Sequence, residues 1–246
     1  MNDSEYKNIF KHESTHFFYR TTHELIIKLV RKLGASRKSL LLDVGCGTGL
    51  LVKKLATFTN AQGVDSHPNA LKFAKLRKIN IRKGSISNLP YQANTFDVIV
   101  CIDVLCHRSI KSDHRALLEL KRILKPEGSL IIRVPAHQFL YSNHDSYVYT
   151  KKRYEYKHFR NALLKAGLSV PYYSYMNLFL FIPSYLKSLL ESKSTTEVKS
   201  SVSRTSPFLN VILYKLLSLE SFFMTRRLPL PFGIELLAIC NKKPSR

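Results

Sequence analysis

The segment 39–49 constrains the fold of this 246-residue chain more than any other. Its apolar part, 39–44, has the length and composition of a buried parallel strand. It leads directly into a loop of small residues, Asp43-Val44-Gly45-Cys46-Gly47-Thr48-Gly49. Glycines suit such a loop, because its backbone can turn sharply and approach a ligand closely. Helical spacing resumes over 50–58, so the segment predicts a strand, a ligand-binding loop and the start of a helix.

Strand-like and helix-like segments alternate along most of the chain. We expect strands at 39–44, 61–64, 79–82, 96–102, 129–134, 168–175 and 234–240. We expect helices within 1–34 and at 50–58, 68–78, 114–124 and 156–166. This order predicts an α/β fold with a doubly wound, Rossmann-like, seven-stranded and mostly parallel sheet.

The alternation suggests one domain with three parts. These are an N-terminal helical cap (1–34), a Rossmann-like core (35–175 plus 234–243) and a helical insertion (176–233). Within the insertion, 177–190 and 207–224 read as apolar helices, and 192–206 reads as a flexible link rich in Ser, Thr and Lys. We expect the insertion to cover one end of the sheet as a lid that buries its apolar face. The alternative is that its helices rest on a membrane surface.

Charge points to the kind of partner. There are 39 Lys and Arg residues against 17 Asp and Glu, a formal net charge of +22. Such an excess favours an anionic partner, namely a phosphate-bearing substrate, nucleic acid or an acidic membrane surface. A lineage with Lys-rich proteins would give the same composition, and the Lys residues are scattered. Hydrophobic residues make up 45% of the chain, which is enough for a sizeable core.

The cysteines and the termini bear on location. Cys46, Cys101, Cys106 and Cys240 form no C-x-x-C pair, so neither a metal site nor a redox motif is indicated. Reduced thiols and a polar N-terminus without signal character favour the cytoplasm, with peripheral membrane contact as an option. No run is expected to reach the length of a membrane-spanning helix.

The loop and the strand after it resemble those of class I methyltransferases. In that family, a D-x-G-x-G-x-G loop binds the methionine part of S-adenosylmethionine, and the acid that ends the next strand holds both ribose hydroxyls. The resemblance implies this cofactor here, with Asp65 in the acidic position, followed by Ser66. The alternative for Asp65 is the N-cap of the following helix.

The resemblance continues beyond the loop. Ser85 stands where the family often has an Asp beside the adenine, and Ile86 follows it. The run Ile102-Asp103-Val104-Leu105-Cys106-His107 resembles the family's D-V-L-E-H element, with Cys106 in place of Glu. This match implies that Ile102, Asp103 and His107 face the cofactor. On the N-terminal cap, the resemblance places Tyr19 and Arg20 near the cofactor, where Arg20 could pair with its carboxylate.

Several motifs resemble a bacterial subgroup of the family that is linked to sugar or glycolipid pathways. The motifs are His16-Phe17-Phe18-Tyr19-Arg20, Val134-Pro135-Ala136, Tyr141-Ser142-Asn143-His144-Asp145, Lys152-Arg153-Tyr154 and Leu230-Pro231-Phe232-Gly233. They imply an O-methyltransferase that acts on a small molecule, a glycan or a lipid-linked sugar.

A hydroxyl acceptor calls for a general base. His144 with Asp145 is the preferred pair, because both follow the fifth strand at the carboxyl edge of the sheet, where ligands bind in such folds. His107 is the second candidate. Both members of the 144–145 pair could instead fix the loop through backbone hydrogen bonds.

Two other functions stay open. The charge suggests an RNA methyltransferase, but no N/D-P-P-Y/F segment follows the fourth strand and no Pro-Cys nucleophile is present, so nucleic acid is not the expected substrate. A non-catalytic module that binds S-adenosylmethionine is the third hypothesis. Cys106 and Ser85, which replace acids of the family pattern, keep it open.

Overall fold

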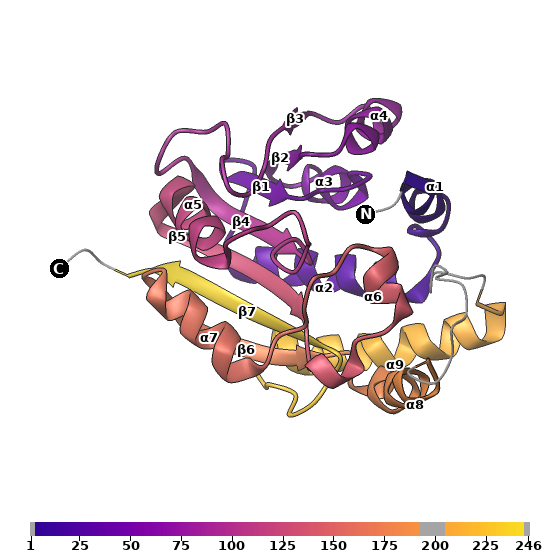
Figure 1. The fold of residues 1–246 in the computed structure, drawn as a ribbon. Coiled ribbons are helices and arrows are strands. Elements are labelled where there is room, and N and C mark those ends of the chain that lie inside the picture. The colour runs from indigo at the N-terminus through magenta and orange to yellow at the C-terminus, as the bar shows by residue number, and fades with distance from the viewer. Residues whose placement is uncertain (1–2, 192–204, 244–246) are drawn as a thin grey trace.

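A single mixed sheet organises the chain (Figure 1). The computed structural model describes residues 3–191 and 205–243. Within them, seven strands follow the order β3-β2-β1-β4-β5-β7-β6, and only β7 runs antiparallel to its neighbours. The strands are β1 (Leu40–Val44), β2 (Asn60–Asp65), β3 (Ile81–Lys83), β4 (Phe96–Ile102), β5 (Leu124–Pro135), β6 (Leu168–Met176) and β7 (Glu235–Lys242).

Helices connect the strands and extend the chain at its N-terminus. They are α1 (Asp3–His12), α2 (Phe17–Lys32), α3 (Leu50–Leu55), α4 (Pro68–Arg77), α5 (Asp113–Ile123), α6 (Asn143–Tyr147), α7 (Tyr156–Lys165), α8 (Phe181–Glu191) and α9 (Pro207–Thr225). Two 3₁₀ turns, η1 (Gln138–Leu140) and η2 (Leu178–Leu180), precede α6 and α8.

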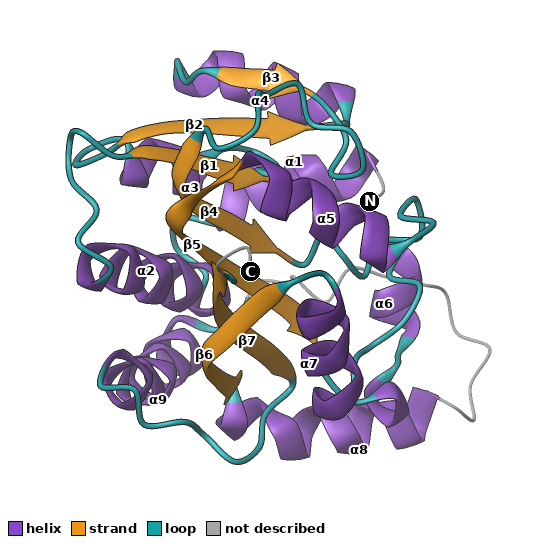
Figure 2. Ribbon diagram, turned by 90° about the vertical axis from the view of Figure 1, so that its left-hand side faces the viewer, coloured by secondary structure: helices purple, strands orange, loops and turns teal. Residues whose placement is uncertain are grey.

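Both faces of the sheet are covered, as the alternating pattern predicted (Figure 2). On one face, α5 and α7 pack through Leu117, Leu120 and Leu163. On the other face, α2, α3 and α9 pack through side chains that include Ile26 and Met224. The expected doubly wound, Rossmann-like α/β class is confirmed.

The register of the sheet brings distant residues to one edge. Val44 at the end of β1 pairs with Val64 of β2 and Cys101 of β4. Because β7 is antiparallel, it begins where β5 ends, and Pro135 pairs with Glu235. The carboxyl ends of β1, β2, β4 and β5 therefore share an edge with the first residue of β7. The strand order reverses between β1 and β4, which is where ligands bind in open α/β sheets.

Some boundaries differ from the sequence expectations. The N-terminal helical region is divided by a turn between α1 and α2. The third strand is 81–83 instead of 79–82. His144 and Asp145 lie on the short helix α6, not in an open loop. A capping box at Ser142 starts that helix, and four-residue patterns of this kind are easily missed in a loop-like sequence.

The insertion is placed differently from the expected lid over one end of the sheet. Helix α9 runs beside α2 on a face of the sheet, and only α8 lies near the carboxyl edge (Figure 2). Most of the expected link 192–206, namely 192–204, lies outside the described residues. The expectation that no run has membrane-spanning length is wrong for α9, which is long and apolar enough by length and composition.

Candidate active site

A cavity of about 560 Å³ opens at the carboxyl edge of the sheet. Its volume suits a small-molecule site. Fourteen of the residues singled out from the sequence line it: Tyr19, Asp43, Gly45, Cys46, Gly47, Asp65, Ser66, Ser85, Ile86, Ile102, Asp103, His107, His144 and Asp145.

The glycine-rich loop forms the part of the wall next to β1. Gly45 has φ +72°, and a Cβ added there would lie 2.2 Å from Cγ2 of Val104. The N–H of Gly47 donates to Oδ2 of Asp65 at 2.9 Å. Gly49, also expected among the cofactor-binding residues, is the N-cap of α3 and is not among the residues that line the cavity. It has φ +80°, a conformation that favours glycine in the turn.

Asp65 ends β2 with its carboxylate turned toward the loop. Its Oδ1 accepts the N–H of His67 at 2.9 Å, and its Oδ2 accepts that of Gly47. Each carboxylate oxygen has two lone pairs, so both retain accepting capacity for a vicinal diol. The alternative that Asp65 is a helix N-cap is wrong, because His67 occupies that position and accepts from the N–H of Asn69.

Helix α1 closes the cavity from the N-terminal side. The buried carboxylate of Glu13, just after α1, accepts hydrogen bonds from Thr48 in the glycine-rich loop and from Arg77 at the end of α4. The Tyr6 ring stacks on His67 with 4.5 Å between centroids. Pattern reading gave no signal for these contacts, because they join residues that lie far apart in sequence.

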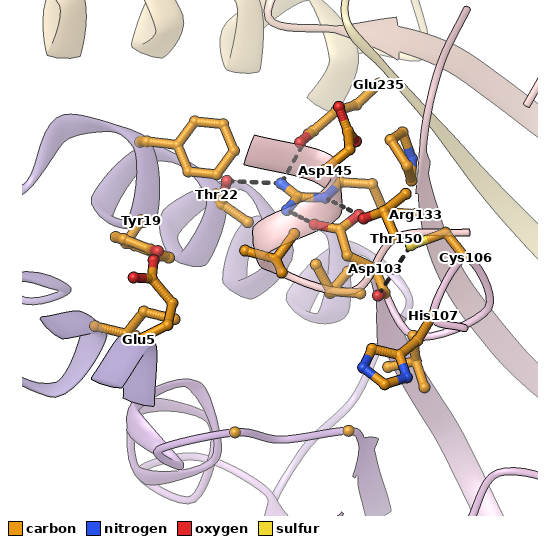
Figure 3. Close-up of a pocket in the computed structure, with 18 of the residues that line it drawn as sticks. Glu5, Tyr19, Thr22, Asp103, Cys106, His107, Arg133, Asp145, Thr150 and Glu235 are labelled. Atoms are coloured by element: carbon orange, nitrogen blue, oxygen red, sulfur yellow. Dashed lines mark hydrogen bonds and ion pairs between the residues drawn. The ribbon is translucent and has the colours of Figure 1, made fainter. Parts of the chain in front are cut away.

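A buried arginine holds the floor of the cavity together (Figure 3). Arg133 of β5 binds the Asp103 carboxylate through Nε and Nη2. Its Nη1 lies 2.9 Å from Oε2 of Glu235 and donates to Thr22 of α2 at 2.9 Å. Sequence reasoning missed Arg133, Thr22 and Glu235. The available signal was a charged residue within the apolar run of β5, because a buried charge needs partners.

At the floor of the cavity, Arg133 contacts the two acidic residues Asp103 and Glu235. Burial raises the pKa of Glu235 to about 8, and the nearby Asp103 acts in the same direction. Burial also raises the pKa of Asp43 to about 8, with a contribution from Asp65. Although the chain is strongly basic, acidic side chains outnumber the cations Arg133, Arg153 and Lys187 at the cavity wall. The acidic residues are Glu5, Glu13, Asp43, Asp65, Asp103, Asp145 and Glu235.

His107 lines the cavity after β4. Its Nδ1 accepts the N–H of Ser109 at 3.2 Å and lies 2.8 Å from the Ser109 hydroxyl. Burial lowers the pKa of His107 to about 4, so the ring is neutral near pH 7. With Nδ1 accepting, the proton of the neutral ring lies on Nε2. His107 is therefore better arranged to donate a hydrogen bond through Nε2 than to take up a proton there.

Asp145, which was expected to pair with His144, makes contacts that hold the local backbone. Its Oδ2 accepts the N–H of Ser142 at 2.9 Å, which caps α6. Both of its oxygens also accept from Arg153, with distances of 3.0 to 3.1 Å. These contacts match the interpretation that Asp145 fixes the loop. The guanidinium of Arg153 is therefore bound within the protein.

Arg20 lies outside the cavity, contrary to its expected pairing with the cofactor carboxylate. Its guanidinium stacks 4.0 Å over the Tyr214 ring of α9. The helical period accounts for the difference: Tyr19, Thr22 and His23 point into the cavity, while Arg20 points toward the neighbouring helix.

Comparison with known proteins agrees with the fold. Residues 42–132 match the family described as a methyltransferase domain. A protein of Methanocaldococcus jannaschii is 33% identical over 166 residues, which cover 67% of this chain and 68% of that relative. The chain belongs to the class I S-adenosylmethionine-dependent methyltransferases.

Other relatives of this methyltransferase are named for different acceptors. Sterol 24-C-methyltransferase of Saccharomyces cerevisiae is 30% identical over 42% of this chain, which spans 29% of that enzyme. Further relatives are named as tRNA and thiol methyltransferases, and the chain spans less than half the length of each. The fold matches a Thermotoga maritima methyltransferase structure with a TM-score of 0.59 at 17% identity, covering 98% of this chain and 96% of that one.

The residues of the cavity fit the cofactor S-adenosylmethionine. Asp65 presents accepting capacity for a diol, and the carboxylate-rich wall suits a sulfonium and an ammonium group. His23 also lines the cavity, and its buried Nδ1 has no hydrogen-bond partner within the described residues.

Proposed function

We propose that this methyltransferase transfers the methyl group of S-adenosylmethionine to a hydroxyl oxygen of a small molecule, a glycan or a lipid-linked sugar, with His144 as general base. The observation that carries the proposal is the part of the cavity beyond the cofactor loop. It combines imidazole, hydroxyl and apolar side chains, namely His107, His144, Ser142, Ser184, Leu140 and Leu180.

Methyl transfer to a hydroxyl requires an acceptor oxygen aligned with the methyl group and a base that takes the hydroxyl proton. Bound cofactor supplies an electrophilic methyl group on a positively charged sulfur. Orienting an acceptor oxygen in line with that methyl group is worth roughly 7–11 kcal/mol. The acceptor oxygen forms the new bond to carbon while the carbon–sulfur bond breaks, and His144 takes the hydroxyl proton. We assign to His107, which lines the same cavity, the role of holding the acceptor by a hydrogen bond.

RNA is the competing acceptor, favoured by the net charge and by the relatives named as tRNA methyltransferases. The acidic side chains that line the cavity oppose it, because a phosphate backbone carries the same charge as an ionised carboxylate. The yeast relative, which is named for a sterol, supports an acceptor with apolar character.

A label-transfer experiment tests the proposal. The protein is incubated with methyl-labelled S-adenosylmethionine and, in separate reactions, a lipid extract, a small-metabolite extract and total RNA. We expect label in the lipid or metabolite fraction, in a methyl ether that resists alkaline hydrolysis. Label in RNA or on nitrogen contradicts the proposal. Calorimetric binding of the cofactor without transfer in any fraction supports the non-catalytic alternative.

A further inference from the structure

The outer surface of α8 and α9 is unusually apolar. All but four of the large exposed hydrophobic side chains in the described residues lie between 179 and 232. The other four are Leu76, Leu118, Phe139 and Tyr173. Soluble proteins expose single hydrophobic residues everywhere, but a contiguous patch of them marks an interaction site.

Helix α8 has two faces with different surroundings. Ser184 and Lys187 line the cavity. The apolar residues Ile182, Leu186 and Leu189 recur at helical spacing on another face, where they are 69%, 54% and 47% exposed. A surface helix ordinarily turns polar residues outward, so this outward apolar stripe needs a partner.

Helix α9 shows the same division. Its inner residues Leu217 and Met224 are buried, the latter in the core beside α2. Its outer residues Phe208, Ile212 and Leu219 follow one another at helical spacing and are exposed. The inner face also carries Tyr214, which donates to Glu24 of α2.

The two stripes are held in a fixed relation. Oε1 of Glu220 on α9 accepts the N–H of Phe179 at 3.2 Å, in the turn that leads into α8. Phe181 of α8 packs edge-on against His137, with 5.7 Å between ring centroids. Both helices lie in the lower part of the molecule (Figures 1 and 2), and both contact the turn η2. We define the apolar surface as the exposed residues Ile182, Leu186, Leu189, Phe208, Ile212 and Leu219.

Charge around the apolar surface selects one kind of partner. Lys187, Lys215, Arg226 and Arg227 are exposed on these two helices and just after them. The described residues 179–190 and 205–232 contain one acidic side chain, Glu220, and it is buried. An apolar stripe flanked by basic residues is the pattern of a helix that lies in the headgroup region of an acidic membrane.

We propose that α8 and α9 dock the methyltransferase onto the surface of an anionic lipid bilayer. Although α9 is long enough to cross a membrane, its inner face is tied to α2 through Tyr214 and Glu24. It therefore lies along the surface. Because α8 borders both the apolar surface and the cavity, a lipid-linked acceptor would reach the cavity past this helix. That last step rests on the proposed function, whereas the docking itself does not.

Vesicle cosedimentation tests the docking. The full chain is mixed with vesicles of phosphatidylcholine alone or with one third phosphatidylglycerol, at low and high salt. We expect binding to the acidic vesicles that weakens as salt rises. The variant Ile182→Ser/Leu186→Ser/Leu189→Ser should bind them at least tenfold more weakly. The matched control Leu76→Ser/Leu118→Ser removes exposed leucines from α4 and α5, so it should bind as the wild type does.

Three results would overturn the docking. The first is a wild-type chain that stays in the supernatant with both vesicles. The second is a dimer in light scattering without lipid that the α8 variant converts to a monomer, because a second copy would then cover the apolar surface. The third is vesicle-bound protein that resists alkaline carbonate extraction, which indicates a spanning helix. Calorimetry with S-adenosylmethionine checks that each variant is folded, so loss of docking is separable from failure of the proposed function.

Discussion

Asp103 and Arg133 form a two-point ion pair at the floor of the cavity, through Nε and Nη2 of the guanidinium. Asp103 follows β4 with φ +57°, an uncommon conformation for a residue other than glycine. The pair joins the carboxyl ends of β4 and β5. Glu235 reaches the same guanidinium from β7, so three strands meet at one buried charge.

Removing this charge should destabilise the fold. In Arg133→Met, Asp103 and Glu235 lose their cation, and we expect the free energy of unfolding to fall by about 3–5 kcal/mol, as when a buried ion pair is broken. Urea denaturation measures the change. Arg133→Met/Asp103→Asn should recover part of the loss, because the uncompensated Asp103 carboxylate is gone. A loss of about 0.5 kcal/mol or less, as for surface substitutions, would contradict the role assigned to Arg133.

Stability should depend on pH through Glu235. Its pKa in the folded protein is about 8, against an ordinary value of 4.5, so the folded state binds more protons between these values. The contribution of Glu235 is therefore fully present at pH 4 and is lost as pH rises to about 8. Urea denaturation across this range should show a steeper decline for the wild type than for Glu235→Gln. The wild type must be compared with Glu235→Gln, because other carboxyl groups also change stability with pH. Those with a lowered pKa, such as Asp113, stabilise the fold more as pH rises. Parallel curves would argue against a protonated Glu235.

Asp65 should control affinity for the cofactor. Asp65→Ala removes the acceptor for the Gly47 N–H and the expected acceptor for the ribose hydroxyls. Hydrogen bonds to a charged group contribute about 1.5–3 kcal/mol each, so the Kd for S-adenosylmethionine in calorimetry should rise at least tenfold. Asp97→Ala is the matched control, because Asp97 also accepts a backbone N–H, from Leu40, at the opposite edge of the sheet. Equal affinities for the two variants would remove Asp65 from the cofactor site.

His144 should affect turnover and leave cofactor binding unchanged. With the acceptor found by label transfer, His144→Ala should lower kcat by about 10²- to 10⁴-fold, the range for loss of a general base. The Kd for S-adenosylmethionine should stay the same. His158→Ala, an exposed histidine on α7, serves as the control. Wild-type turnover in His144→Ala would exclude it as the base.

Local sequence patterns predicted the sheet and the part of the site formed by the glycine-rich loop and the acid after β2. Strand and helix periodicity, with the glycine-rich loop after β1, predicted the doubly wound sheet. The D-x-G-x-G-x-G spacing and the acid after β2 predicted which loop residues would line the cavity. These features are readable because each depends on a few consecutive residues, as a tight turn or a strand end does.

The remaining features depend on which elements become neighbours. Arg133, Glu235 and Thr22 come from β5, β7 and α2, and only the antiparallel insertion of β7 brings the three to one edge. Glu13 is tied to Thr48 and Arg77 in the same way, across long stretches of chain.

The sequence by itself determined the strand–loop–helix unit that indicates S-adenosylmethionine as the methyl donor, because the geometry of its turn depends on consecutive residues. The tertiary structure alone decided which face of each helix is covered. Arg20 was expected at the cofactor but faces Tyr214. The outer faces of α8 and α9 were expected to pack on the domain but are exposed. An apolar stripe specifies that a partner is needed, and only the arrangement of neighbouring elements shows whether the chain itself provides one.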